Sequence, residues 1–414
     1  MDMDTIQRAS QVDQFADVLF GQLSGGEDAF SDTMSCLVQS VRKRLNMEVA
    51  FVSEFTSGRR VFRFVDSQQG VEIIRVGQGD PLDESYCQRV VDGRLPELIT
   101  NAQLLPAACA LPVTQALPVG AHVSVPIRLT GGSVFGTFCT FSRYGDDSLD
   151  ERDLAMVRVF ADLAGALISK HLDALDSVHL MRSRIIELMA KDQLMLVGQP
   201  IVDLQSGSTV GYELLSRVEG ANRMRPDVLF EDAARVGMSQ ALGLRTIEKA
   251  CQIMSRFTNG TFVALNLTPE FILQSDLSGL FGTGSLENLV LEITEHAIIK
   301  DYSALRDKLA PLRERGARVA IDDAGAGYAS LRHILQLMPD IIKLDISLIQ
   351  DIDKDEERQA LATALIAFSR CRRYHLIAEG IENAQELATL QSLGTEWGQG
   401  YFFARPQPMQ SLWN

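Results

Sequence analysis

The chain has 414 residues, which suits two or three domains rather than one. Its formal net charge of −15 argues against a nucleic-acid polymer or an anionic membrane as the main partner. An anionic substrate would then need a local positive charge, such as a bound divalent cation. No apolar run is long enough for a membrane span, and the acidic, polar start is unlike a signal peptide.

Residues 1–147 are expected to form an α+β domain. Helical periodicity runs through 5–23 and 32–47. The strand-like runs that follow are separated by turn-rich segments, which predicts an antiparallel sheet with flanking helices. These runs are 48–55, 59–66, 71–77, 122–129 and 134–142.

Residues 148–193 have a helical pattern throughout, and Ser148 with Glu151 predicts a capping box at its start. One interpretation is a single connecting helix that pairs with a copy of itself. The other is two separate helices, each packed on its own domain. The pattern leaves both open.

Residues 194–414 alternate between strand and helix, and their length suits a (β/α)8 barrel. The first two strand-like runs flank "QSGS" and resemble a hairpin, so we expect one antiparallel strand. The expected strands are 195–204, 211–215, 262–266, 289–293, 319–322, 341–345, 376–380 and 400–404. The expected helices include 227–257, 301–315, 347–373 and 383–393.

The six cysteines are scattered, without a Cys-x-x-Cys pair. We therefore expect neither a disulfide framework nor a zinc site, and a reducing, cytoplasmic location fits best. Each cysteine is expected to be a small buried apolar residue. They are Cys36, Cys87, Cys109, Cys139, Cys251 and Cys371.

Polar residues recur at the carboxyl ends of the barrel strands, which converge on one face of such a barrel. Any one of them could be a helix cap or a surface ion pair, but a whole series of strand ends is hard to explain in that way. A carboxylate that ends a buried strand needs a partner. The series is Glu213, Asn266, Glu292, Asp322, Asp323, Lys343, Asp345, Glu379, Glu382 and Gln399.

The candidate metal ligands are all oxygen donors: Glu213, Asn266, Glu292, Asp322 and Asp323. Hard oxygen ligands favour Mg²⁺ or Mn²⁺ over zinc. Adjacent aspartates suit two ions that share one carboxylate, an arrangement that binds the attacking and leaving oxygens of a phosphoryl displacement. Lys343 adds a positive charge for a phosphate or a water, and Glu379 can take the proton of the water.

Residues 194–411 resemble the EAL-domain phosphodiesterases, which hydrolyse cyclic di-GMP. The family's motifs occur in order as "QPI" (199–201), "ELLSR" (213–217), "LNLTP" (265–269), "EITE" (292–295), "DDAGAGYASL" (322–331), "PDIIKLD" (339–345), "AEGIE" (378–382) and "GQGYFFARP" (398–406). The chain departs from the usual pattern at Leu214 (usually alanine), Ala324 (usually phenylalanine) and Ala329 (commonly serine).

The resemblance implies a role for each matching residue. One metal would be held by Glu213, Asn266, Glu292 and Asp322, and the second by Asp322 and Asp323. Glu379 would be the base or a water ligand, Lys343 would orient the water, and Glu295 would anchor the loop after the two aspartates. Gln199, Arg217 and Gln399 would contact the nucleotide. The implied product is linear pGpG.

The resemblance also implies a homodimer that forms through the barrel, to which the helix at 148–193 could contribute. Residues 14–170 resemble a GAF sensor domain, on "ESYCQRVVDGRLPELITNA" (84–102) and "GAHVSVPIRLTGGSVFGTFCTFS" (120–142). That implies a signal-input domain with an unknown ligand, which regulates the barrel; a dimerisation domain without a ligand is the alternative. Gln88, not histidine, follows Cys87, so a core cysteine is expected there rather than a bilin attachment site.

The leading hypothesis is therefore a metal-dependent cyclic di-GMP phosphodiesterase regulated by its N-terminal domain. The altered loop at Ala324 suggests an alternative, a catalytically weak or inactive receptor for cyclic di-GMP. A third interpretation, a phosphate-binding glycine loop at "GAGYAS", lacks the Gly-Lys-Ser/Thr that such loops need.

Overall fold

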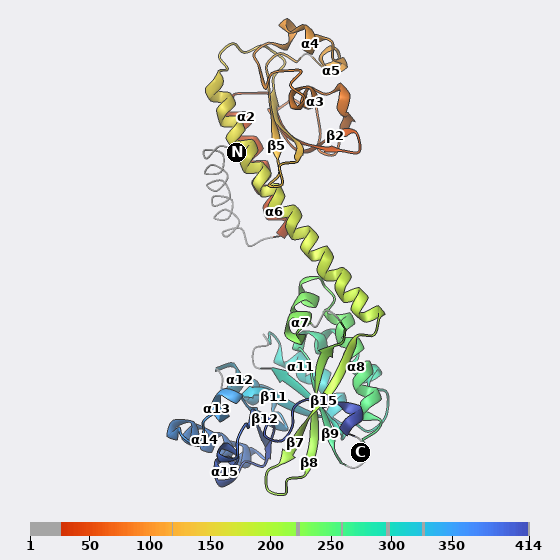
Figure 1. Cartoon of the computed structure of the whole chain (residues 1–414), viewed down its shortest axis with the longest axis vertical. Helices are drawn as coiled ribbons and strands as arrows, with labels where there is room; N and C mark the ends of the chain where they lie inside the picture. Colours follow the sequence, from red (N-terminus) through yellow and green to blue (C-terminus); the bar gives the residue numbers. More distant parts are fainter. Residues whose placement is uncertain are drawn as a thin grey trace. The chain divides into compact units, whose positions relative to one another are not determined.

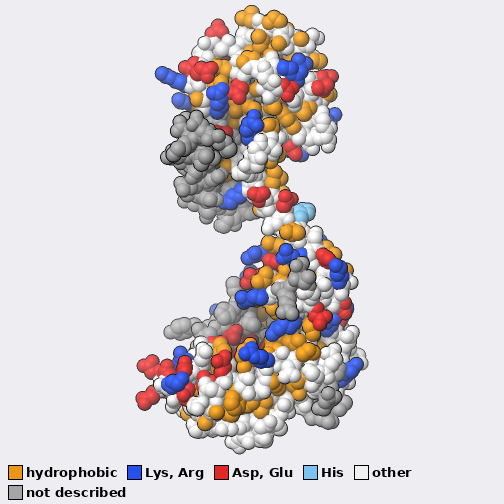
Figure 2. All heavy atoms as spheres, viewed as in Figure 1, with side chains coloured by type: hydrophobic (Ala, Val, Ile, Leu, Met, Phe, Trp, Pro, Cys, Tyr) orange, Lys and Arg blue, Asp and Glu red, His pale blue; other side chains and the backbone are white. Residues whose placement is uncertain are grey.

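The computed structural model describes residues 26–117, 119–220, 224–257, 260–294, 299–324 and 328–412 (Figure 1). The helix expected at 5–23 lies outside these residues. The chain divides into two compact units, Met1–Ser177 and Val178–Asn414. Among the described helices, none is long and apolar enough to cross a membrane. Acidic and basic side chains are interspersed on the visible face of both units (Figure 2).

The N-terminal unit contains an antiparallel sheet with flanking helices, as predicted. The strand order is β3-β2-β1-β6-β5-β4. The strands are β1 (Val49–Thr56), β2 (Arg59–Ser67), β3 (Gly79–Pro81), β4 (Leu98–Ile99), β5 (His122–Arg128) and β6 (Val134–Phe141). The helices are α2 (Gly26–Arg44), α3 (Tyr86–Val91), α4 (Pro106–Cys109) and α5 (Pro112–Ala116), with 3-10 turns η1 (Leu82–Glu84) and η2 (Ala102–Leu104).

The strand predicted at 71–77 is wrong. Val71, Ile73 and Ile74 pack against a buried cluster around Phe51 and Phe62, but their backbone joins no ladder. The third strand forms only at Gly79–Pro81, after the turn at Gly77. The apolar residues of this run are partly buried, but their burial does not require a strand.

The long helix α6 (Glu151–Ala190) is continuous. Its first turn is capped by Asp150 rather than by the predicted Ser148. The Asp150 carboxylate accepts hydrogen bonds from the backbone N–H of Arg152 and Asp153, and the Asp153 carboxylate accepts one from the N–H of Asp150. The Ser148 hydroxyl instead donates to Asp146. The capping box is real but lies two residues further along the chain.

The C-terminal unit is a closed eight-stranded barrel. Strands β8 to β14 are parallel neighbours in chain order, and β7 pairs antiparallel with both β8 and β14. This confirms the barrel and its single antiparallel strand. The strands are β7 (Leu194–Asp203), β8 (Thr209–Val218), β9 (Phe262–Asn266), β10 (Leu289–Thr294), β11 (Arg318–Ala324), β12 (Ile341–Leu344), β13 (His375–Ala378) and β14 (Trp397–Gly398). A short strand β15 (Gln407–Pro408) and a turn η3 (Met409–Leu412) follow.

Helices cover the outside of the barrel, and two of the expected ones are each divided in two. Gly237 breaks the first at a positive φ, and Asp351 breaks the second in the same way. The helices are α7 (Pro226–Arg235), α8 (Ser239–Met254), α9 (Pro269–Gln274), α10 (Leu277–Leu280), α11 (Tyr302–Arg313), α12 (Tyr328–Leu337), α13 (Ile346–Ile349), α14 (Glu356–Arg372) and α15 (Ala384–Leu393).

The last barrel strand was predicted at 400–404, but it lies at Trp397–Gly398. Trp397 pairs with Ile377 on one side and with Asp203 on the other, so the barrel closes earlier than the aromatic run suggested. Tyr401 and Phe402 are exposed. The aromatic pattern of residues 400–404 thus predicted a buried strand where the structure has exposed side chains.

The inside of the barrel has two layers. A buried apolar cluster fills one layer, with Ile201, Phe262, Ala264, Val290, Ala320, Ile341 and Ile377. Two residues further along five of these strands stand Asn266, Glu292, Asp322, Lys343 and Glu379. Because side chains alternate across a strand, the second residue points to the same interior. The polar layer therefore lies on the apolar one, at the carboxyl ends of the parallel strands.

His122 on β5 is a buried polar residue of the N-terminal unit, and the centre of its ring lies 4.7 Å from that of Tyr86, with the rings tilted by 37°. Its Nδ1 atom has no hydrogen-bond partner among the described residues. Burial, and secondarily the Arg60 guanidinium, lowers the pKa of His122 from 6.5 to about 3. The folded unit therefore holds the ring neutral.

We predict that the N-terminal unit loses stability as the pH falls below about 6.5. Between the two pKa values the unfolded chain binds a proton that the folded chain excludes, so acid favours unfolding, by at most about 1.4 kcal/mol per pH unit. Amide hydrogen exchange in β5 and β6, corrected for intrinsic rates, should show less protection at pH 5.5 than at pH 7. His122→Gln should reduce this difference, while His179→Gln, at an exposed position on α6, should not. Equal pH dependence in His122→Gln and the parent would contradict the assignment.

Candidate active site

The Lys343 ammonium lies at the centre of the polar layer. The side chain is completely buried, which is rare for lysine. Its Nζ atom lies 2.8 Å from Glu379 Oε1, 3.0 Å from Glu292 Oε2, 3.0 Å from Asp322 Oδ1 and 3.7 Å from Glu213 Oε1. Four carboxylates from four different strands or strand ends therefore surround one cation.

This arrangement raises the pKa of the lysine and of two of its partners. Burial would lower the pKa of Lys343, but the carboxylates around it outweigh burial and raise the pKa well above its usual range. Burial raises the pKa of Glu292 far above its usual range against the opposing effect of Lys343, and it raises that of Glu379 to about 8. One ammonium cannot neutralise four ionised carboxylates. Without metal ions, the site therefore retains protons on some of these carboxylates.

The carboxylates retain unused ligand atoms. Glu292 Oε1 is buried and has no hydrogen-bond partner among the described residues, whereas Asp322 Oδ1 is paired with the Lys343 ammonium at 3.0 Å. Buried oxygens of this kind are costly unless a cation or a donor satisfies them. Carboxylate oxygens of Asp322, Asp323 and Glu379 lie within 4.8 Å of one another. The oxygen-only set fits divalent cations of the Mg²⁺ or Mn²⁺ type.

Asp323 reaches this group only because the backbone is unusual there. Adjacent residues in a strand normally point to opposite faces. Asp323 has a φ of 57°, in the left-handed region, and the pairing of β11 with β12 is irregular between Ile321 and Ala324. The local bend places both aspartates on one side. Strain of this kind is commonly retained at functional sites.

An amide network holds the Glu213 carboxylate. Asn266 Nδ2 donates to Glu213 Oε1 at 3.1 Å, and Gln399 Nε2 donates to Glu213 Oε2 at 2.5 Å. Gln399 Nε2 also donates to Gln199 Oε1 at 3.1 Å, and Gln199 Nε2 donates to the Ala404 carbonyl at 3.2 Å. Asn266 therefore keeps its amide oxygen as the atom that could bind a cation.

Two predicted residues lie apart from this cluster. Arg217 is on the same face of β8 as Glu213, further along the strand, and its Nη1 atom donates to the Ser216 carbonyl at 2.7 Å. Glu295 lies outside the described residues. Ala324, the departure from the family pattern, is buried in the barrel core and pairs with Leu344.

A cavity of about 270 Å³ opens over the polar layer. Besides predicted residues it is lined by Leu215, Ile346, Gly380, Gly400 and Tyr401, which the sequence interpretation did not single out. The Arg405 guanidinium lies 4.2 Å from the centre of the Tyr401 ring. The misassigned aromatic run at 400–404 was the signal that could have identified Tyr401.

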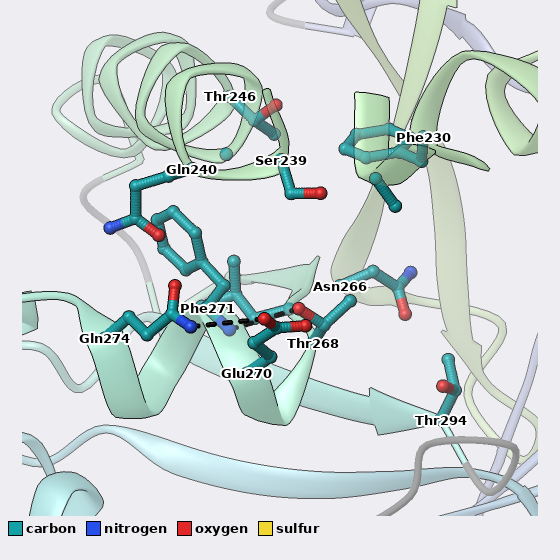
Figure 3. A pocket seen from close by; sticks show the side chains of 13 residues that line it. Phe230, Ser239, Gln240, Thr246, Asn266, Thr268, Glu270, Phe271, Gln274 and Thr294 are labelled. Carbon is teal, nitrogen blue, oxygen red and sulfur yellow. Dashed lines mark hydrogen bonds between the residues drawn. The ribbon is translucent and has the colours of Figure 1, made fainter. Parts of the chain in front are cut away.

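A second cavity, of about 280 Å³, is lined in part by Asn266 (Figure 3). Helices α7, α8 and α9 form it. Phe230 and Phe271 supply apolar walls, while Gln240 and Gln274 supply amides. Planar apolar walls with a few amides suit a flat, polar-edged group such as a nucleobase. These residues lie on helices, so strand-end reasoning did not find them.

Comparisons with known proteins place these features in context. The family model described as "EAL domain" matches residues 182–406, and the model described as "GAF domain" matches residues 28–169. Cyclic di-GMP phosphodiesterase PdeF of Escherichia coli is 28% identical over 55% of this chain and 32% of its own length. An uncharacterized signaling protein of Caulobacter vibrioides is 31% identical over 54% of this chain and 29% of its own. The chain thus spans about a third of the length of these relatives.

Solved structures agree on the barrel. The PaMucR phosphodiesterase in complex with c-di-GMP has a TM-score of 0.52 and 26% identity, over 56% of this chain and 99% of that one. An EAL domain protein of Listeria monocytogenes has a TM-score of 0.51 and 23% identity, over 56% of this chain and 95% of that one, which supports the fold alone.

We predict that Lys343→Met destabilises the metal-free barrel by about 3–5 kcal/mol, because it removes the cation from a buried group of carboxylates. Urea unfolding in the presence of a chelator, followed by the fluorescence of the two tryptophans, which both lie in the C-terminal unit, measures the loss. Lys354→Met removes an exposed i,i+3 pair with Asp351 and should change nothing measurable. An equally stable Lys343→Met protein would show that the ammonium does not balance these carboxylates.

Proposed function

Because the chain belongs to the EAL-domain family, we propose that its barrel hydrolyses cyclic di-GMP to linear pGpG with two divalent cations, Mg²⁺ or Mn²⁺. The observation that carries the proposal is the complete set of oxygen ligands around the buried Lys343, with the Glu292 oxygen left unsatisfied. Relatives that share the domain are named cyclic di-GMP phosphodiesterases, and the PaMucR structure contains c-di-GMP.

The proposed metal ligands are Glu213, Asn266, Glu292, Asp322 and Asp323, with Asp322 shared between the ions. When bound, the cations would stabilise charge on the attacking and leaving oxygens of an in-line displacement. Asp322 suits the shared position, because it lies near both Lys343 and the cluster with Asp323 and Glu379.

The remaining side chains would handle the water and its proton. The Lys343 ammonium, donating within the polar layer, would orient the water. The Glu379 side chain is 17% exposed, so as a carboxylate beside bound cations it can accept the proton of the water and pass it to solvent. Glu295 would anchor the loop after the aspartates.

Substrate binding would use both cavities. Gln199 and Gln399 lie at the wall of the first, where they would contact the nucleotide, and Arg217 lies further along β8, where its charge would meet a phosphate. The apolar second cavity would accept a nucleobase. Arg217 would thus supply local positive charge for an anionic substrate in a chain whose net charge is −15.

The N-terminal unit would regulate the barrel as a GAF-type input domain whose ligand is unknown. The match of residues 28–169 to the GAF model and the continuity of α6 support this part of the proposal. The cytoplasmic location that the cysteine pattern suggested stays a prediction.

A receptor without hydrolytic activity is the second candidate, and Ala324 is the observation that favours it. The small side chain sits in the core immediately after the double aspartate, where a phenylalanine would anchor more strongly. Weaker anchoring would lower the rate, but the metal ligands themselves are all present.

We predict that the protein converts cyclic di-GMP to pGpG with Mg²⁺ or Mn²⁺, and that Asp322→Asn lowers the rate at least about 100-fold because it weakens both metal sites. Chromatography of the nucleotide products measures this. Asp345→Asn is a matched control: Asp345 also ends a barrel strand, but it caps α13 through the N–H of Ser347, and asparagine caps equally well. Its activity should stay within about twofold.

The same assay compares the full chain with residues 194–414, and a different rate is expected if the N-terminal unit regulates the barrel. Tight binding of cyclic di-GMP without turnover by either protein would establish the receptor instead.

We further propose that two barrels pair through α12. Leu331 and Leu335 are exposed one turn apart on this helix, and Met338, just after its end, is exposed too. Leu335→Glu should convert a dimer into a monomer in sedimentation experiments, because it places a charge in an apolar contact. Ile186→Glu, at an exposed position on α6, tests the connecting helix. A dimer that is lost only in Ile186→Glu would move the interface from α12 to α6.

A further inference from the structure

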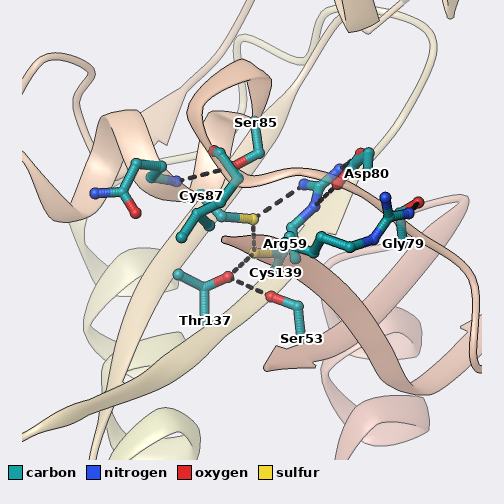
Figure 4. A network of polar contacts seen from close by, with 11 residues as sticks. Ser53, Arg59, Gly79, Asp80, Ser85, Cys87, Thr137 and Cys139 are labelled. Atoms are coloured by element: carbon teal, nitrogen blue, oxygen red, sulfur yellow. Dashed lines mark hydrogen bonds and ion pairs between the residues drawn. The ribbon is translucent and has the colours of Figure 1, made fainter. Parts of the chain in front are cut away.

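Two cysteines that are far apart in the sequence meet inside the N-terminal unit. Cys87 on α3 and Cys139 on β6 are both completely buried, and their Sγ atoms lie 3.4 Å apart (Figure 4). The other cysteines do not share this arrangement: Cys36 and Cys371 are exposed, contrary to the expectation that every cysteine is buried. All six are free thiols in the structure.

A fixed positive charge faces one of the two sulfurs. Arg60 Nη1 donates to Cys87 Sγ at 3.1 Å, and Arg60 Nε donates to Asp80 at 2.9 Å, which holds the guanidinium in place. Arg60 itself is only 5% exposed and packs over the Phe51 and Phe62 rings. An arginine buried against a thiol favours the thiolate.

The two thiols are chemically different. Burial would raise the pKa of Cys87, but the hydrogen bond from Cys139 and the Arg60 charge outweigh it and lower the pKa to about 5. Burial and the neighbouring Cys87 raise the pKa of Cys139 well above its usual range. Ser124 and Thr137 hydroxyls lie 3.1 Å from the Cys139 sulfur. The Cys87 sulfur is thus suited to act as a nucleophile, whereas the Cys139 sulfur stays protonated.

A small cavity lies beside Arg60, the hydrogen-bond partner of Cys87. It has about 30 Å³ of space for water-sized molecules and is lined by Arg60, Tyr86 and His122 among other residues. Such a space holds only one or two molecules of that size. Because both sulfurs are closed to solvent, a reactant must be as small as a hydroperoxide.

We propose that Cys87 and Cys139 form a reversible dithiol–disulfide pair that is oxidised by hydrogen peroxide. This inference concerns the N-terminal unit and does not depend on the activity of the barrel. The peroxide supplies the oxidant, and a cellular thiol reductant would restore the dithiol.

The Cys87 thiolate attacks one peroxide oxygen, the O–O bond breaks, and the leaving hydroxide takes up a proton to become water. Cys87 is then a sulfenic acid. The Cys139 sulfur attacks the Cys87 sulfur, the S–O bond breaks, and the hydroxyl leaves as water with the Cys139 proton. Two thiols are oxidised to a disulfide, and one peroxide is reduced to two waters.

The geometry favours the second step over competing products. The sulfurs must approach from 3.4 Å to about 2.05 Å, which a small rotation of the side chains can supply. Bond formation ties α3 to β6 and removes the thiolate that faces Arg60. Loss of the thiolate leaves the Arg60 charge at the cavity wall less balanced, so the net charge there becomes more positive by one unit. An anion in the cavity would then be bound more strongly.

Peptide mass spectrometry of the full chain tests this proposal. After treatment with hydrogen peroxide, the protein is denatured and its remaining thiols are alkylated. Digestion without reductant should then yield a peptide pair joined through Cys87 and Cys139. A reductant should restore both thiols. In Cys139→Ser, dimedone added together with denaturant after removal of the peroxide should trap the sulfenic acid on Cys87, while Cys87→Ser should give no dimedone adduct on Cys139.

Cys371→Ser is the matched control, because Cys371 is exposed in the other unit; it should leave the joined peptides unchanged. Circular dichroism verifies that each variant is folded. The proposal is wrong if Cys87 and Cys139 remain alkylatable at peroxide concentrations that oxidise Cys36 and Cys371. It is also wrong if the disulfides that form join either residue to a cysteine other than its neighbour.

Discussion

The barrel depends on the balance of charge around one buried ammonium. The Lys343 ammonium faces the carboxylates of Glu213, Glu292, Asp322 and Glu379. Burial of these charged groups is costly unless their mutual attraction offsets the lost hydration. The offset is incomplete, since Glu292 Oε1 has no hydrogen-bond partner among the described residues. A site with this excess of negative charge favours the binding of further positive charge, which is the electrostatic requirement of a metal-dependent site.

The position of this group follows from the alternation of side chains in the strands. Val290 and Glu292, Ala320 and Asp322, or Ile341 and Lys343 differ by two residues, so the apolar and polar members of each pair face the same interior. Closure of the sheet by the antiparallel β7 then fixes the distances between strands. The apolar layer excludes water from below, which strengthens every charge interaction in the polar layer above it.

This alternation is also why most of the site was predictable. An apolar run that ends in a carboxylate can be recognised in one dimension, and the barrel brings such ends together. Asp323 could be included only through its neighbour, because its orientation depends on a left-handed backbone that the residues 318–324 do not reveal. Phe230 and Gln240 were missed because they line a cavity between helices. The misplaced last strand shows the converse error: exposed Tyr401 and Phe402 look like core residues in sequence.

The cysteine pair shows where sequence reasoning fails in principle. Cys87 and Cys139 are 52 residues apart, and only the pairing of β6 with β1 and the packing of α3 bring their sulfurs together. The two units nevertheless share one kind of interaction. In each, a buried cation stabilises the charged form of a group that burial alone would keep neutral. In the barrel Lys343 is outnumbered by carboxylates, whereas Arg60 has Asp80 and a single thiol as partners. The first arrangement therefore leaves negative charge for metal ions, and the second leaves one nucleophilic sulfur, whose oxidation would change the charge beside the cavity.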